Sequence, residues 1–244
     1  MGVTLRIAMW SGPRNISTAM MRSWENRADC SVVDEPFYAA YLRATGLQHP
    51  CRAEILSSQG NDYQQVIAAI TGGEVDTALQ YLKQMTHHMP ADLDMGWCVS
   101  LRHCFLVRDP AQVIASYLQK MPSVSEDDIG IRRQAELFRQ ITSVTGVVPA
   151  VIDSSDVLKN PEKILAELCN YLQVDFPTEQ MLHWPAGTRA SDGVWAQHWY
   201  HSVEQSTGFD EYRDKTPTLS EEHWSLAGAM QPFYDELAEL RIRP

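Results

Sequence analysis

The sequence lacks three features that would each place it in a broad class of proteins. It contains no run of about 18 or more apolar residues, so no membrane-spanning segment is predicted. Its five cysteines are odd in number and form no Cys-x-x-Cys pair, which favours a reduced, cytoplasmic protein over a disulfide framework or a structural zinc site. Positive charge is also scarce, and the net charge of −11 argues against binding to nucleic acid or to an anionic membrane.

The N-terminal residues carry no recognisable targeting signal. Residues 1–6 lack the charged-then-apolar order of a signal peptide, and Arg6 stands where a myristoylation signal needs Ser or Thr. We therefore expect residues 1–6 to be part of the folded protein. A chain of 244 residues with 44% hydrophobic residues can bury a sizeable core, and we expect one domain over residues 1–244. Nothing in the sequence indicates an oligomeric state.

Short apolar strands alternate with helical segments along the chain. Periodicity leaves residues 77–88 open between a helix and a strand, and residues 57–62 read as a loop before a short helix. The Trp- and His-rich stretch at about 176–215 is interpreted as a lid or cap. This alternation predicts a three-layer α/β/α fold with a mostly parallel central sheet, whose ligands bind at the carboxyl ends of the strands. Strands are expected at 5–10, 31–33, 104–107 and 149–153, and helices at 16–27, from 110, at 129–145, from 160 to 171 and at 220–240.

The loop Trp10–Thr18 joins the first strand to the first helix. Such a loop presents unpaired N–H groups and the positive end of a helix dipole to an anion. Arg14 adds a forked cation, and Ser17 adds a hydroxyl donor. No lysine stands where the GxxxxGK[ST] motif requires one, so an ordinary ATPase or GTPase is disfavoured. The alternative interpretation is that Ser17 only caps the helix.

A second arginine lies at the carboxyl end of another strand. Arg108 follows the strand at 104–107, and Asp109 with Pro110 forms a plausible helix start. Ser116 lies eight residues after Arg108, on the helix face that can point back toward it. The alternative is a surface salt bridge between Arg108 and Asp109 or another carboxylate.

These two sites, in this order, resemble the nucleotide-binding pair of the sulfotransferase family, which uses 3′-phosphoadenosine 5′-phosphosulfate (PAPS) as donor. In that family a loop such as Pro-Arg-Ser-Gly-Thr-Thr holds the 5′-phosphosulfate. An Arg-(Asn/Asp)-Pro motif, with a serine eight residues after the arginine, holds the 3′-phosphate. The resemblance implies a P-loop NTPase-like fold, and Ile16 stands where the family has glycine. The donor-binding residues that it implies are Gly12, Arg14, Asn15, Ser17 and Thr18 on the 5′ side, Arg108 and Ser116 at the 3′-phosphate, and Arg189 in a late loop over the donor.

Residues 82–90 resemble the family's Lys-Thr-His-Leu-Pro element, which carries a lysine and a catalytic histidine. His88 precedes Pro90 by two residues, as in the family, so His88 is the favoured general base and His87 the second choice. Lys83 is set back from the family position. On this resemblance the segment is a strand followed by a loop. The alternatives are surface histidines or a zinc site, and no third metal ligand stands at diagnostic spacing.

The residues after the second strand are expected at the same edge of the sheet as the first loop. Glu35 could orient an acceptor, pair with an arginine, or only solvate the loop, and Tyr38 is a second acceptor-binding candidate. The resemblance thus implies sulfuryl transfer from PAPS to a hydroxyl or amine of a small molecule, without a metal. One alternative is a P-loop kinase, with Asp153 and Asp34 as the candidates for Mg²⁺. The other is a non-catalytic relative that has lost its donor, for which Ile16 is the argument.

Overall fold

The computed structural model describes residues 4–214 and 216–243. In this part of the chain five strands form one sheet in the order β2-β3-β1-β4-β5, and every neighbouring pair is parallel. The predicted mostly parallel sheet is therefore confirmed. The strands are β1 (Leu5–Ser11), β2 (Cys30–Asp34), β3 (Leu79–Met85), β4 (Arg102–Val107) and β5 (Ala150–Asp153).

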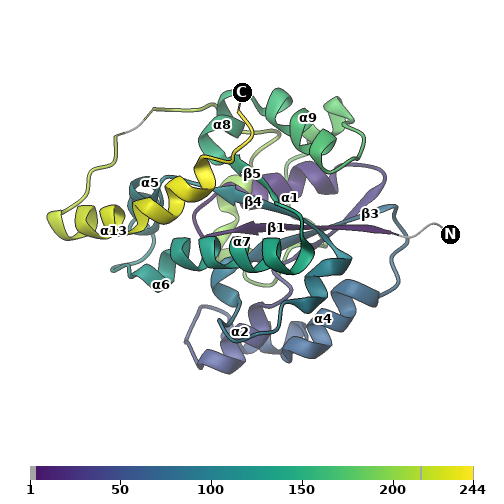
Figure 1. The fold of residues 1–244 in the computed structure, drawn as a ribbon, viewed down its shortest axis with the longest axis horizontal. Coiled ribbons are helices and arrows are strands. Elements are labelled where there is room, and N and C mark those ends of the chain that lie inside the picture. The colour runs from purple at the N-terminus through teal and green to yellow at the C-terminus, as the bar shows by residue number, and fades with distance from the viewer. Residues whose placement is uncertain (1–3, 215, 244) are drawn as a thin grey trace.

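Helices cover both faces of the sheet, which gives the three predicted layers (Figure 1). Residues 7–10 of the central strand β1 are fully buried, because side chains alternate between two covered faces. Ile7 and Met9 belong to one buried cluster, and Ala8 and Trp10 to the other. The first face packs against α1 (Ser17–Glu25), α8 (Ser154–Lys159) and α9 (Pro161–Tyr171), and the second against α4 (Tyr63–Gly72), α7 (Ile131–Thr145) and α13 (Glu221–Ala238).

Shorter elements surround the carboxyl edge of the sheet and the connections between strands. The helix start predicted at Asp109 and Pro110 is confirmed for α5: Asp109 accepts a hydrogen bond from the Gln112 N–H at 3.0 Å, and Pro110 occupies the first turn. They are α2 (Tyr38–Thr45), α3 (Arg52–Ser58), the 3₁₀ turns η1 (Thr86–His88) and η2 (Gly96–Ser100), α5 (Pro110–Tyr117), α6 (Glu126–Ile129), α10 (Thr178–Leu182), α11 (Ala196–Trp199) and α12 (His201–Glu204).

Three sequence predictions are settled by the backbone. The ambiguous stretch 77–88 is strand β3 followed by the turn η1, because β3 is inserted between β1 and β2 and pairs with both. The helix predicted at 129–145 is confirmed as α7 from Ile131 to Thr145, and only its first two residues differ: Ile129 ends α6, and Gly130, with φ +63°, separates the two helices. The loop predicted at 57–62 is partly wrong, since α3 continues through Ser58.

The expectation for the N-terminus is tested only in part. Residues 1–3 lie outside the described residues, and β1 begins at Leu5. Among the residues that the structure describes, no helix combines the length and the hydropathy needed to cross a bilayer.

Candidate functional site

A cavity of about 330 Å³ lies at the carboxyl ends of the strands, where the sequence predicted a ligand site. Four strands contribute residues to it: β1 through the loop that follows it, β2 through Glu35, β3 through Lys83 and the turn η1, and β4 through Arg108. Most of the predicted residues therefore meet in one place. The predicted residues that line the cavity are Arg14, Asn15, Ser17, Thr18, Glu35, Tyr38, His87, His88, Arg108 and Ser116.

The two predicted arginine sites contact each other directly. The Arg14 Nε donates a hydrogen bond to the Ser116 hydroxyl at 3.2 Å, and the Arg108 guanidinium donates to the Arg14 carbonyl at 2.5 Å. Burial lowers the pKa of both arginines, and the charge of Arg14 lowers the pKa of Arg108 further. Asp109 caps α5, and neither arginine pairs with a carboxylate among the described residues, so the salt-bridge alternative for Arg108 is not what the structure shows. Two half-buried cations that pair with no carboxylate among the described residues are suited to a polyanion.

The amino end of α1 faces the same cavity without a side-chain cap. The N-cap position is occupied by Ile16, and no side chain accepts from the first-turn N–H groups. Residues 17–19 line the cavity, so those N–H groups and the helix dipole are available to an anion. The alternative in which Ser17 only caps the helix is therefore not realised. Ile16 has φ −82°, an ordinary value, and it packs against the core; the left-handed residue of this loop is Arg14, with φ +54°.

Asn15 and Gly12 shape this loop. The Asn15 amide donates to the Leu106 carbonyl at 3.0 Å, and its oxygen accepts from the Ile16 N–H at 3.0 Å, which fixes the loop on β4. Gly12 does not line the cavity. A Cβ on Gly12 would lie 2.8 Å from the Ile129 carbonyl oxygen, so glycine is required there for close packing against the end of α6.

The two histidines of η1 are held among aromatic rings. The His88 ring stacks on Tyr38 and Tyr41, at centroid distances of 4.6 and 4.8 Å, and its Nε2 lies 4.0 Å from a carboxylate oxygen of Glu35. Burial lowers the pKa of His87 to about 4 and that of His88 well below 6.5. The Nδ1 atoms of both are buried without a hydrogen-bond partner among the described residues. Both rings are therefore neutral at pH 7 and able to accept a proton or a hydrogen bond.

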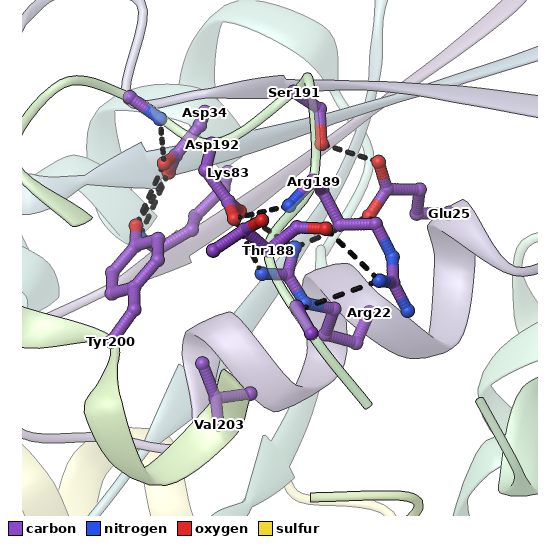
Figure 2. A network of polar contacts seen from close by, with 12 residues as sticks. Arg22, Glu25, Asp34, Lys83, Thr188, Arg189, Ser191, Asp192, Tyr200 and Val203 are labelled. Atoms are coloured by element: carbon purple, nitrogen blue, oxygen red, sulfur yellow. Dashed lines mark hydrogen bonds and ion pairs between the residues drawn. The ribbon is translucent and has the colours of Figure 1, made fainter. Parts of the chain in front are cut away.

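Lys83 forms the centre of a buried polar cluster with Asp34, Glu35 and Tyr200. Its ammonium donates to Asp34 at 2.9 Å, to Glu35 at 2.7 Å and to the Tyr200 hydroxyl at 2.5 Å. Tyr200 in turn donates to Asp34 at 2.7 Å, as Figure 2 shows. Burial opposes the charge of Lys83, but the two carboxylates raise its pKa well above 10.5; burial raises the pKa of Glu35. This cluster ties residue 200 to the ends of β2 and β3.

Arg189 does not line the cavity. Its guanidinium donates to the carbonyls of Pro185, Gly187 and Thr188 and lies 3.9 Å from Glu25 (Figure 2). The neighbouring Asp192 pairs with Arg22 of α1 at 2.7 Å. These bonds fix residues 188–192 on α1. Other residues of the late segment do line the cavity, namely Trp195, Trp199, Tyr200, Ser202, Val203, Ser206, Gly208 and Asp210.

The carboxylates proposed for Mg²⁺ under the kinase alternative are already engaged. Asp34 pairs with Lys83, while Asp153 caps α8 through the Ser155 N–H at 2.7 Å and accepts from Tyr234 at 2.8 Å. In residues 4–214 and 216–243, no group of three or more His, Cys, Asp or Glu side chains is arranged to hold a metal ion.

Comparison with known proteins agrees with this geometry. The sequence matches the family described as "Sulfotransferase domain" over residues 5–240. The chain belongs to the sulfotransferase family. Two curated relatives from Arabidopsis thaliana, branched-chain-amino-acid aminotransferase-like proteins 1 and 2, are 33% and 32% identical over 231 residues, which is 95% of this chain and 41% of theirs. The chain thus spans less than half the length of the curated relatives it matches.

Solved sulfotransferases share its fold. The sulfotransferase domain from the curacin biosynthetic pathway aligns over 100% of both chains, with a TM-score of 0.55 and 17% identity. The sulfotransferase from Alicyclobacillus acidocaldarius covers 100% of this chain and 98% of its own, with a TM-score of 0.57 and 11% identity. Mouse sulfotransferase SULT7A1, complexed with PAP, covers 97% and 85%, with a TM-score of 0.51 and 10% identity. The predicted P-loop NTPase-like fold is confirmed.

Sequence reasoning missed part of the cavity of this member of the sulfotransferase family. The sequence indicates Lys83 only as a lysine set back from the family position, and Asp34 only as a candidate metal ligand. Their pairing depends on the adjacency of β2 and β3, which the sequence does not reveal. The one available signal is the position of Lys83 between Leu82 and Gln84 in a segment that can form a strand, since a buried lysine requires a partner. Tyr41, Tyr117 and Asp128 also line the cavity, and no motif marks them.

Proposed function

We propose that the protein transfers a sulfuryl group from PAPS to a hydroxyl or amine of a small acceptor. The observation that carries this proposal is the meeting of Arg14, Arg108 and the uncapped end of α1 in one cavity with the neutral base His88. Two unpaired arginines and free helix N–H groups match a donor with phosphates at two positions. The PAP complex of the mouse relative supports the same donor class.

The donor supplies a sulfuryl group: the acceptor O–S or N–S bond forms as the bond from sulfur to the phosphate oxygen breaks, and that electron pair leaves on adenosine 3′,5′-bisphosphate. The chain positions charge around this step. Arg14 and the amino end of α1 stabilise negative charge on the 5′ side, and Arg108 with Ser116 binds the 3′-phosphate. Residues 176–215 act as a lid, and the whole chain works as one domain.

His88 takes the acceptor proton at Nδ1. The Glu35 carboxylate near Nε2 favours the tautomer that carries its hydrogen on Nε2, which leaves the Nδ1 lone pair free. Lys83 holds Glu35 in place through a contact of 2.7 Å. All five cysteines are free thiols, which supports a reducing, cytoplasmic location.

Calorimetry with adenosine 3′,5′-bisphosphate and adenosine 5′-phosphate tests the donor site. We expect Arg108→Ala to weaken the bisphosphate by about tenfold to a hundredfold, the usual loss for a charge-assisted contact, and to change the monophosphate little. Arg43→Ala, on the exposed end of α2 and outside the cavity, is the matched control. Failure of the wild-type protein to bind the bisphosphate at millimolar concentration, or equal losses for both nucleotides, contradicts the proposal.

A further inference from the structure

Among the described residues that line the cavity, the acceptor would meet carboxylates, and the two arginines assigned to the donor are the cations that pair with no carboxylate. The charge of the Lys83 ammonium is already balanced by its ion pairs with Asp34 and Glu35. Asp128 of α6 also lines the cavity and takes part in no ion pair among the described residues. An acceptor that is itself anionic would meet carboxylates in this cavity and the negative phosphates of the donor. A cationic acceptor would find a carboxylate available.

The Asp128 carboxylate is held in a fixed position. One of its oxygens accepts from the backbone N–H and the hydroxyl of Ser125, at 2.8 and 2.6 Å, in the capping box of α6. Within the part of the chain that the structure describes, the other oxygen accepts only from the Tyr117 hydroxyl, at 3.3 Å. This second oxygen retains the capacity to accept a strong hydrogen bond, and its position is set before any ligand arrives.

Aromatic rings line the same cavity as this carboxylate. Tyr38, Tyr41, Tyr117 and Trp195 all contribute to its wall, and the Tyr41 ring lies 5.6 Å from His87 and 4.8 Å from His88. Ring faces attract organic cations, and a carboxylate among such faces is the usual recognition set for an ammonium group. The partnerless Nδ1 atom of His88, whose side chain is 2% exposed, independently indicates a ligand that donates a hydrogen bond there.

We infer that the acceptor is a small organic cation that carries a hydroxyl group, with its cationic centre bound by Asp128 among the tyrosine rings and its hydroxyl directed to His88. This inference rests on the proposed sulfuryl transfer and narrows the substrate class. The cationic centre is separate from the hydroxyl oxygen that attacks sulfur, so binding and proton removal involve different groups of the acceptor.

Calorimetry with choline and its neutral isostere 3,3-dimethylbutan-1-ol tests the inference, because these hydroxylated probes differ in one charged atom. With the protein saturated by adenosine 3′,5′-bisphosphate, we expect choline to bind about tenfold more tightly. Asp128→Asn, which keeps an oxygen for the α6 cap, should abolish that preference. Asp127→Asn, an exposed neighbour outside the cavity, should retain it. Equal binding of the two probes, no choline binding at tens of millimolar, or a preference that survives Asp128→Asn overturns the inference.

The same titration on the protein without nucleotide separates the two levels of the argument. If the bisphosphate binds and choline shows no preference, the cation site is refuted and the donor site stands. If choline is preferred and the bisphosphate does not bind, the cation site stands and sulfuryl transfer is refuted. Circular dichroism of Asp128→Asn establishes that the overall fold is intact.

Discussion

At the scale of single residues, the site consists of charged and polar groups moved away from their usual state by burial. His87 and His88 are neutral because an imidazolium would lose its hydration in this cavity. Arg14 and Arg108 remain cations that form no ion pair with a carboxylate of residues 4–214 or 216–243. Each of these conditions costs folding free energy, and each leaves a group ready to bind a ligand or a proton. The cost of neutral histidines is measurable because it depends on pH.

The pH dependence of stability should reveal the lowered pKa of His87. In the unfolded chain its pKa is near 6.5 and in the fold about 4, so the unfolded state binds more protons in between. The contribution of neutral His87 to the free energy of unfolding is fully present above pH 6.5 and is lost as the pH falls toward 4. Between pH 7 and 5.5 this loss is about 1 kcal/mol. Urea denaturation should show that, from pH 7 to 5.5, the free energy of unfolding of His87→Gln falls by that amount less than the free energy of unfolding of the wild-type protein.

His201→Gln is the control for this measurement, since His201 is exposed on α12. It should lose stability with acid as the wild-type protein does. A His87→Gln variant with the wild-type slope would mean that His87 is not held neutral by burial.

At the scale of elements, local chemistry predicted the helix starts that a capping side chain marks. Asn160 accepts from the Lys163 N–H at the start of α9, and Asp109 accepts from the Gln112 N–H at the start of α5, because a cap acts within one turn. The prediction missed the break at Gly130, which places Ile129 in α6 and the start of α7 at Ile131. A Cβ on Gly130 would lie 3.3 Å from the Thr86 hydroxyl and 3.4 Å from His87, so the turn η1, distant in sequence, requires the close approach.

Gly12→Ala tests a similar contact in the phosphate loop. The added Cβ would lie 2.8 Å from the Ile129 carbonyl oxygen, and only backbone movement relieves that overlap. We expect the free energy of unfolding to fall by about 1–3 kcal/mol. Binding of adenosine 3′,5′-bisphosphate should weaken as well, because the loop also positions Arg14.

The matched control is Gly228→Ala on α13, where a Cβ meets nothing within 4 Å. It should leave binding unchanged and raise stability by up to about 1 kcal/mol through helix propensity. Urea denaturation measures the stability of both variants, and calorimetry measures their binding of adenosine 3′,5′-bisphosphate. If Gly12→Ala and Gly228→Ala change stability and binding equally, Gly12 has no packing role.

At the scale of the whole molecule, the parallel sheet and the position of the site were predictable, while the contacts across it were not. Strand ends gather at one edge in any parallel α/β fold, which is why Arg14 and Arg108 could be expected to meet. Strand order could not be read from the sequence, and the pairing of Asp34 with Lys83 requires β2 beside β3. Tyr200 is 117 residues from Lys83, and no local pattern connects them.

The cluster around Lys83 connects the late segment to the sheet, and removing one hydroxyl tests that connection. Tyr200→Phe keeps the ring and deletes the group that accepts from Lys83 and donates to Asp34. A buried ammonium and carboxylate then each lose a partner, so we expect about 1–3 kcal/mol of destabilisation. Asp34 also accepts from the Gly193 N–H at 3.1 Å, so the loss should extend along the segment.

Hydrogen exchange followed by mass spectrometry should show a larger acceleration over residues 188–203 than in β1 and β4, because the late segment opens locally while those strands exchange only on global unfolding. Tyr212→Phe is the control: among the described residues its hydroxyl has no hydrogen bond, and its ring lies under Lys159. Uniform acceleration across the sheet would show a general loss of stability instead. Wild-type exchange in residues 188–203 of Tyr200→Phe would show that Arg22, Asp192 and Glu25 alone hold the segment in place.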